Sequence, residues 1–189
     1  MIDIAGTITE HCSVVQGLDP IIPDIETVGQ KMSAAVHNDG KILWMGNGGS
    51  AADSQHLAAE LVGRFQRERR ALASIALTTD TSILTAVGND YGYDTIFQRQ
   101  VEALATPRDV VVGISTSGNS ANVLRGIRQA QKSGAFTVGM TGKSGGKLAD
   151  AVDVCLAVPA EKTARIQEMH ILIGHILCDW TEKSVLVSD

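Results

Sequence analysis

The feature that most constrains the fold is an alternation between short apolar runs and longer segments with helical periodicity. Five apolar runs are predicted to be strands: 41–45, 72–77, 110–114, 136–140 and 152–158. Several are apolar almost throughout, which is typical of parallel strands covered on both faces. Helical patterns occupy 1–18, 24–38, 50–65, 80–87, 94–104, 120–133 and 163–184. The alternation predicts an α/β fold: a single domain with a doubly wound, parallel, five-stranded sheet flanked by helices.

The chain has 189 residues, which is enough for one domain with an apolar core. Its first two helices are separated by Asp19-Pro20 and Pro23, which a continuous helix would not tolerate well. We therefore expect residues 1–40 to form an N-terminal helical arm, part of the same domain and of an oligomer interface. Residues 41–189 are expected to form the main body of the domain.

Composition and charge argue against several classes of protein. No apolar run approaches the roughly 18 residues needed to span a bilayer, and the N-terminus lacks the pattern of a signal peptide. Cys12, Cys155 and Cys178 are widely spaced, which argues against a disulfide framework and suits a reducing, cytoplasmic location. The net charge of -5 disfavours nucleic-acid binding, and the basic cluster at 64–70 is interpreted as a solvated helix end.

A hydroxyl-rich loop follows the strand predicted at 110–114. Ser115, Thr116, Ser117 and Ser120 lie just before a predicted helix. Such a loop offers hydroxyl donors and the free N–H groups of a helix N-terminus, whose dipole favours an anion. It lacks the lysine of a Walker loop, so it indicates a phosphate monoester rather than a nucleoside triphosphate. The alternative is an ordinary turn with a serine helix cap, because Ser, Thr and Asn are favoured there in any case.

A glycine-rich loop follows the first predicted strand. Its sequence at 46–51, Gly-Asn-Gly-Gly-Ser-Ala, formally matches the G-x-G-x-x-A dinucleotide fingerprint. The acidic residue expected about 20 residues later is missing, because the basic stretch 67–70 stands there. We therefore expect no nucleotide cofactor. The glycines instead indicate close passage of the backbone to a small polar ligand.

The helix predicted at 50–65 carries a polar line opposite its apolar stripe. His56, Glu60 and Arg64 follow one another at steps of four residues. Such a line normally faces water, so the spacing alone favours a weak surface pair over a catalytic one.

The last predicted helix has a similar second face, on which Gln167, Ile171 and His175 lie at steps of four. A lone histidine on a largely apolar helix is more often a core residue than a ligand or catalyst. Because Ile171 lies between the two polar residues, we expect this face to be buried in an oligomer. Burying the polar side chains of Gln167 and His175 would cost free energy unless they are hydrogen-bonded or take part in ligand binding or catalysis.

Several motifs, taken in order from about residue 24 to the end, resemble the phosphoheptose isomerases, a family of SIS sugar-phosphate isomerases. The motifs are Gly46-Asn47-Gly48-Gly49-Ser50, the His56–Glu60 pair, Gly88-Asn89-Asp90, the segment 113–120, Thr141-Gly142, Arg165-Ile166-Gln167-Glu168 and His175. The resemblance implies an SIS domain that interconverts sedoheptulose 7-phosphate and D-glycero-D-manno-heptose 7-phosphate. It also implies a homotetramer with active sites at subunit interfaces.

The resemblance further implies roles for individual residues. Glu60 matches the catalytic base and His175 the catalytic acid. The positions that match substrate contacts are Asn47, Gly48, Gly49, Ser50, Glu60, Arg64, Asn89, Asp90, Ser115, Thr116, Ser117, Ser120 and Gln167. Some members hold one zinc ion per subunit through residues that match His56, Glu60, Gln167 and His175. The partner implied is a phosphorylated seven-carbon sugar, with no nucleic acid and no membrane.

The residue types agree with this chemistry. Aldose–ketose isomerisation moves a proton between adjacent carbons through an enediol, and a carboxylate such as Glu60 is able to carry that proton. An imidazole such as His175 is able to serve the oxygens. Zinc would polarise the carbonyl as a Lewis acid.

Two alternatives compete with the enzyme. The DnaA initiator-associating protein is a non-catalytic SIS adaptor that shares the fold and much of the serine loop. It lacks the acidic and histidine side chains at the positions that match Glu60 and His175, and this chain has both, which favours the enzyme. A sugar-phosphate-sensing SIS module usually accompanies a further domain, for which 189 residues leave no room.

Overall fold

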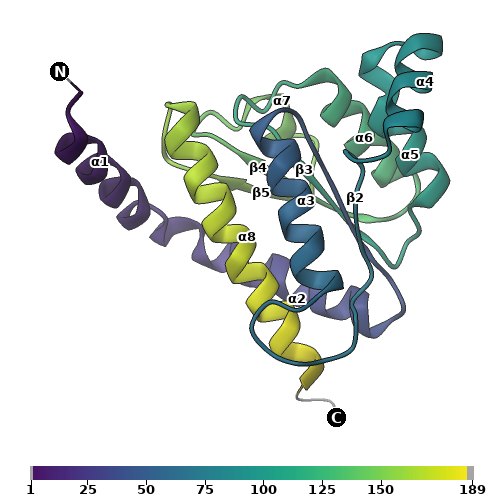
Figure 1. Ribbon diagram of the computed structural model, residues 1–189, viewed down its shortest axis with the longest axis horizontal. Coiled ribbons are helices and arrows are strands. Elements are labelled where there is room, and N and C mark those ends of the chain that lie inside the picture. The colour runs from purple at the N-terminus through teal and green to yellow at the C-terminus, as the bar shows by residue number, and fades with distance from the viewer. Residues whose placement is uncertain (1, 187–189) are drawn as a thin grey trace.

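The computed structural model describes residues 2–186 and contains a five-stranded, wholly parallel sheet with strand order β2-β1-β3-β4-β5 (Figure 1). The strands are β1 (Ile42–Gly46), β2 (Ser74–Ala76), β3 (Val110–Ile114), β4 (Phe136–Thr141) and β5 (Val154–Ala157). The α-helices are α1 (Ile4–Gln16), α2 (Ile22–His37), α3 (Gly49–Val62), α4 (Thr81–Tyr91), α5 (Ile96–Leu104), α6 (Ala121–Lys132), α7 (Gly146–Ala149) and α8 (Thr163–Leu186). Short 3₁₀ turns occupy Asp19–Ile21 and Tyr93–Thr95. The predicted fold class is confirmed.

Helices cover both faces of the sheet because successive side chains of each strand point to opposite sides. Ile42 and Trp44 of β1 belong to one apolar core, which α2, α3 and α8 complete. Leu43 and Met45 belong to a second core, which α5 and α6 complete. In Figure 1, α2, α3 and α8 lie together on one side of the strands. This two-sided burial accounts for the nearly continuous apolar strands.

The strand order puts a topological switch between β1 and β3. The chain moves from β1 outward to β2 and then returns to the other side of β1 to form β3. Gly46 and Ile114 are in register at the carboxyl ends of these two strands. The glycine-rich loop and the serine loop therefore begin side by side, at the position where ligands bind in doubly wound sheets.

Helix α1 projects from the body as an arm, and none of its residues is buried (Figure 1). Polar contacts attach it to the start of α8. The Arg165 guanidinium donates to the Thr7 carbonyl over 2.8 Å, and His11 Nδ1 lies 2.7 Å from a carboxylate oxygen of Glu168. The expected division at residue 40 stays a prediction, and residues 1 and 187–189 of the expected segments lie outside the described residues.

The basic cluster was expected to be a solvated helix end, but it lies in a loop beyond the helix, and only Arg64 and Arg70 of its arginines are exposed. Helix α3 ends at Val62, so the predicted helix was too long, and the chain continues as a loop. The side chain of Arg69 is only 2% exposed and pairs with the buried carboxylate of Glu182 on α8. The buried carboxylate of Glu182 therefore holds this basic loop against the body.

Two further helical segments, α4 and α7, differ from expectation. Helix α4 continues to Tyr91, so the Gly88-Asn89-Asp90 motif is helical. Helix α7 was not predicted, because four residues are too few to show a 3.6-residue period. Between residues 2 and 186, no helix is both long enough and apolar enough to cross a membrane.

Candidate active site

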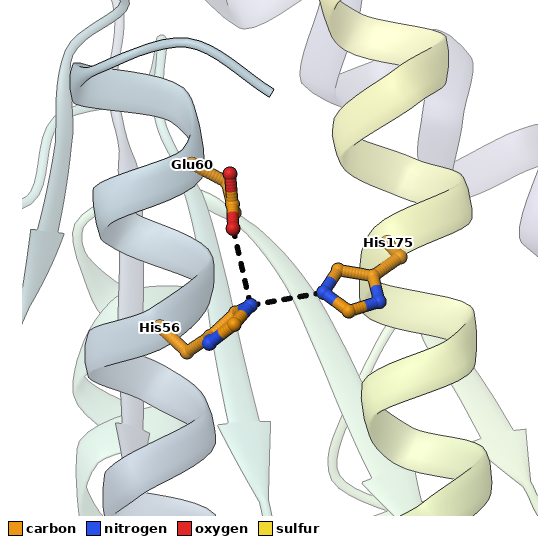
Figure 2. Close-up of side chains that lie close together, drawn as sticks. All are labelled: His56, Glu60 and His175. Carbon is orange, nitrogen blue, oxygen red and sulfur yellow. Dashed lines mark hydrogen bonds and ion pairs between the residues drawn. The ribbon is translucent and has the colours of Figure 1, made fainter. Parts of the chain in front are cut away.

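Two helices bring His56, Glu60 and His175 together (Figure 2). His56 and Glu60 lie one turn apart on α3, and His56 Nε2 is 3.1 Å from Glu60 Oε1. His175 reaches across from α8, and its Nε2 lies 2.9 Å from Nε2 of His56. The histidine and glutamate on α3 are therefore not an isolated surface pair, which was the interpretation that their spacing alone favoured.

The close approach of α3 and α8 has a local cause. Gly174, the residue before His175, faces Leu57, the residue after His56. A Cβ on Gly174 would lie 2.5 Å from the side chain of Leu57, so a larger residue would force Leu57 or the helices to shift. The ring of Phe65 stacks on His175 with 5.4 Å between centroids, which fixes the imidazole from its other side.

This cluster has the donor set of a metal site. The ligand atoms of His56, Glu60 and His175 all lie within 4.8 Å of one another. Two imidazoles and one carboxylate suit Zn²⁺, and three protein ligands leave a further position for water or substrate.

Burial raises the pKa of nearby Asp53, although the charge on His56 opposes that effect. Its Oδ2 atom is buried without a hydrogen-bond partner among the described residues.

The serine loop is held in a single shape by the segment that follows β4. The amide of Gly142 donates to the Thr116 carbonyl over 3.0 Å, and the amide of Leu148 donates to the Gly118 carbonyl over 2.9 Å. Gly118 has φ +65°, and a Cβ there would lie 1.9 Å from the Gly145 carbonyl oxygen. The loop therefore requires glycine at this turn.

The hydroxyls of this loop do not act as a simple helix cap. Ser120 is the residue before α6, but its side chain makes no capping hydrogen bond. Its Oγ instead lies 2.9 Å from Oγ of the buried Ser115. Ser117 is exposed, and with Thr116 it lines a pocket of about 620 Å³ whose wall also includes Lys143. A larger pocket of about 770 Å³, at the amino ends of the strands, contains none of the predicted site residues.

Asn47 and Asn122 join the two loops across the switch between β1 and β3. Their side-chain amides exchange two hydrogen bonds of 2.9 and 2.8 Å. Tyr93 donates its hydroxyl to the same Asn47 oxygen over 3.0 Å. The side-chain amide of Gln167 lies against Gly49 at the start of α3, about two turns of α8 away from His175.

Comparisons with known proteins show the family to which the chain is similar. Residues 16–142 match the family model of the SIS domain. A phosphoheptose isomerase of Geotalea daltonii is 55% identical over 182 residues, which are 96% of this chain and 95% of that protein. A phosphoheptose isomerase of Aquifex aeolicus is 58% identical over 154 residues, 82% of this chain and 81% of the relative.

A solved structure leads to the same family. The phosphoheptose isomerase of Neisseria gonorrhoeae is 46% identical, with a TM-score of 0.90 over 95% of this chain and 97% of that one. The chain belongs to the phosphoheptose isomerases.

Not every residue that the phosphoheptose isomerase resemblance implies lies in the His56 cluster. Arg64 is exposed beyond the end of α3 and lies 3.9 Å from Glu68. Asn89 and Asp90 are exposed on α4, where Asn89 donates to the Asp90 carboxylate over 2.8 Å. The described interactions of these three residues are thus with near neighbours in the sequence.

Sequence reasoning missed three polar residues of this phosphoheptose isomerase. Asn122 and Tyr93 contact Asn47, and Glu182 holds the loop after α3. Asn122 follows the serine loop by two residues, and that position was a usable signal. Nothing in the sequence pattern connects Tyr93 or Glu182 with the site.

Proposed function

We propose that the chain interconverts sedoheptulose 7-phosphate and D-glycero-D-manno-heptose 7-phosphate, with Glu60 as the base and His175 as the acid. The observation that carries this proposal is the meeting of an acid and two imidazoles from distant parts of the chain. Membership of the phosphoheptose isomerases supports the substrate.

The serine loop is the proposed anchor for the phosphate. Ser115, Thr116, Ser117 and Ser120 supply hydroxyls, and α6 presents its N-terminal amide groups at the same place. A dianionic phosphate is stabilised there both by hydrogen bonds and by the positive end of the helix dipole. Anchoring one end of the sugar leaves its carbonyl end free to enter the site of proton transfer.

Proton transfer is assigned to Glu60. A carboxylate takes the proton from one carbon of the hydroxy-carbonyl pair and returns it to the neighbouring carbon, through an enediol. His175 protonates and deprotonates the two oxygens in turn. Asn47, Gly48, Gly49, Ser50, Arg64, Asn89, Asp90 and Gln167 are the further positions that we assign to binding of the sugar.

We assign one zinc ion per subunit to His56, Glu60, Gln167 and His175. The two imidazoles and the carboxylate fit this ion, as their convergence indicates. When bound, zinc supplies Lewis-acid polarisation of the sugar carbonyl. The chain's own residues hold the sugar and move its protons.

A homotetramer in the cytoplasm is the proposed assembly and location. Helix α1 has no buried residue, and its Ile4 and Ile8 are exposed. A short amphipathic helix gains most of its stability from packing, so a second copy is the natural cover for this arm. Ile176 on α8, next to His175, is also exposed, which supports active sites at subunit interfaces.

The test is an assay of purified protein with sedoheptulose 7-phosphate in deuterated water, followed by NMR. Conversion to the aldoheptose phosphate, with deuterium at the carbon next to the carbonyl, is the expected result. A preparation of the Glu60→Gln, His175→Ala double variant controls for a contaminating host isomerase. Wild-type protein that binds the ketose phosphate without converting it would favour the non-catalytic adaptor.

A further inference from the structure

A buried charged pair lies behind the catalytic cluster, and its first member, Arg69, contacts the backbone that carries Glu60. The Arg69 guanidinium donates to the Glu60 carbonyl over 2.9 Å and to the Gly63 carbonyl over 2.8 Å. Both lie at the end of α3, where carbonyl groups lack helical partners. The positive charge also matches the negative end of the helix dipole. Arg69 therefore holds the last turn of α3 in place.

The second member, Glu182, is fully buried on α8 and holds the loop that follows α3. Its carboxylate accepts hydrogen bonds from the amides of Phe65, Gln66 and Arg67 over 2.9, 2.9 and 3.0 Å. It also lies 3.4 Å from Nε of Arg69. Burial alone would raise the pKa of Glu182, but these amides and Arg69 outweigh that effect and lower it. The carboxylate is therefore charged, and both of its oxygens accept hydrogen bonds from the loop.

The placement of this pair connects it with the reaction. Glu182 follows His175 by about two turns, so both lie on the same face of α8. A chain of contacts connects the two helices: Glu182, on the same helix as His175, pairs with Arg69, and Arg69 donates to the backbone carbonyl of Glu60. Leu57 against Gly174 is a further contact between the two helices. Contacts at separate points along the helices fix their rotation as well as their separation.

A buried ion pair is a poor source of net stability, because two charges must lose their water. A helix interface that needed only stability would be served as well by apolar side chains. We infer that Glu182 and Arg69 are positioning residues, which set the place of Glu60 relative to His175 for the reaction proposed above.

The experiment compares Arg69→Lys and Glu182→Gln with a matched control, Arg67→Gln. Lysine keeps the charge but loses the planar fork that reaches both carbonyls. The Arg67 side chain also faces Glu182, at 3.5 Å, but it does not contact Glu60. Melting temperature and oligomeric state show which variants fold.

For folded variants we expect Arg69→Lys and Glu182→Gln to lower kcat by about 10–100-fold, the scale of a misplaced catalytic group. KM should change by less than about 3-fold, because the serine loop lies elsewhere; Arg67→Gln should leave both constants near wild type. Wild-type kcat in both Arg69→Lys and Glu182→Gln would overturn the inference. An equal loss in Arg67→Gln would also overturn it.

The failure of this inference differs from a failure of the proposed reaction. If wild-type protein does not isomerise the sugar, the proposed reaction is wrong. The positioning pair is then judged on the imidazole ¹⁵N chemical shifts of His56 and His175. Shifts that move in Arg69→Lys but not in Arg67→Gln support the pair. Shifts that are the same in both variants and in wild type refute it.

Discussion

The Nε2 atoms of His56 and His175 lie 2.9 Å apart, although the two residues are separated by 119 positions in the chain. Two imidazole nitrogens at this distance repel one another if both carry a proton or if both present a lone pair. A shared proton or a bound cation removes that repulsion. The carboxylate of Glu60, 3.1 Å from His56, adds negative charge that favours the cation.

The first prediction concerns the zinc content of the purified protein. Protein purified without chelator is expected to contain about one zinc per chain by elemental analysis, and His175→Ala should lower that content at least ~10-fold. His37→Gln, at the end of α2, is the control for loss of any imidazole. Chelator should lower activity and added zinc should restore it. Activity and metal content that respond to neither treatment would show that zinc is not required.

Turnover is the second prediction. Glu60→Gln and His175→Ala should each lower kcat by at least ~100-fold, the lower range of general acid–base effects. Glutamine keeps the shape of glutamate, so the fold should survive. Glu68→Gln, which neutralises a side chain that is 92% exposed, should keep wild-type kcat in the same assay. Near-normal turnover in both site variants would show that the catalytic roles are wrongly assigned.

Phosphate binding is the third prediction. Ser117→Ala should raise KM for the sugar phosphate by about 10-fold, because a hydrogen bond to a charged group contributes about 1.5–3 kcal/mol. The Ki of inorganic phosphate as a competitor should rise in parallel, while kcat stays within about 3-fold of wild type. Ser133→Ala, at the far end of α6, is the matched control. Unchanged affinity for both ligands in Ser117→Ala would count against the serine loop.

The acid stability of the fold depends on His170. Burial lowers the pKa of His170 to about 4, although a hydrogen bond to the Thr141 carbonyl opposes this. In the unfolded chain His170 is therefore protonated as the pH falls below about 6.5, whereas in the folded chain it is protonated only below about pH 4. Stability should consequently fall by up to about 1.4 kcal/mol per pH unit as the pH drops through this window.

His170→Gln should flatten that slope, because glutamine does not titrate and is able to keep the donor to Thr141. Urea unfolding at pH 6.5 and pH 4.5 measures the difference. A slope that is equally steep in His170→Gln would assign the acid sensitivity to other groups.

The sequence predicted the sheet well, for a physical reason. Strands covered on both faces are apolar throughout, as at Val110–Ile114, and glycine or polar residues end them. Helix boundaries that depend on tertiary contacts were harder to predict from the sequence. The end of α3 at Val62 reflects the capture of the next segment by Glu182, a residue more than a hundred positions away.

The site was only partly accessible from sequence. Helical spacing placed His56 and Glu60 on one face, but it could not show that His175 meets them, because that contact depends on how α3 packs against α8. Only the family resemblance joined the three. Glu182 remained hidden for the same reason, since the amides that it binds belong to a loop with no periodic signal.

Helix α8 is the last element that the structure describes, and it carries His175. Synthesis runs from the N-terminus, so all five strands and the serine loop leave the ribosome before this helix does. Until it docks, the core that it shares with α2 and α3 lacks the apolar side chains of α8, and the reaction centre has no second imidazole. A chain that stops before residue 163 therefore lacks part of the apolar core and the second imidazole at once.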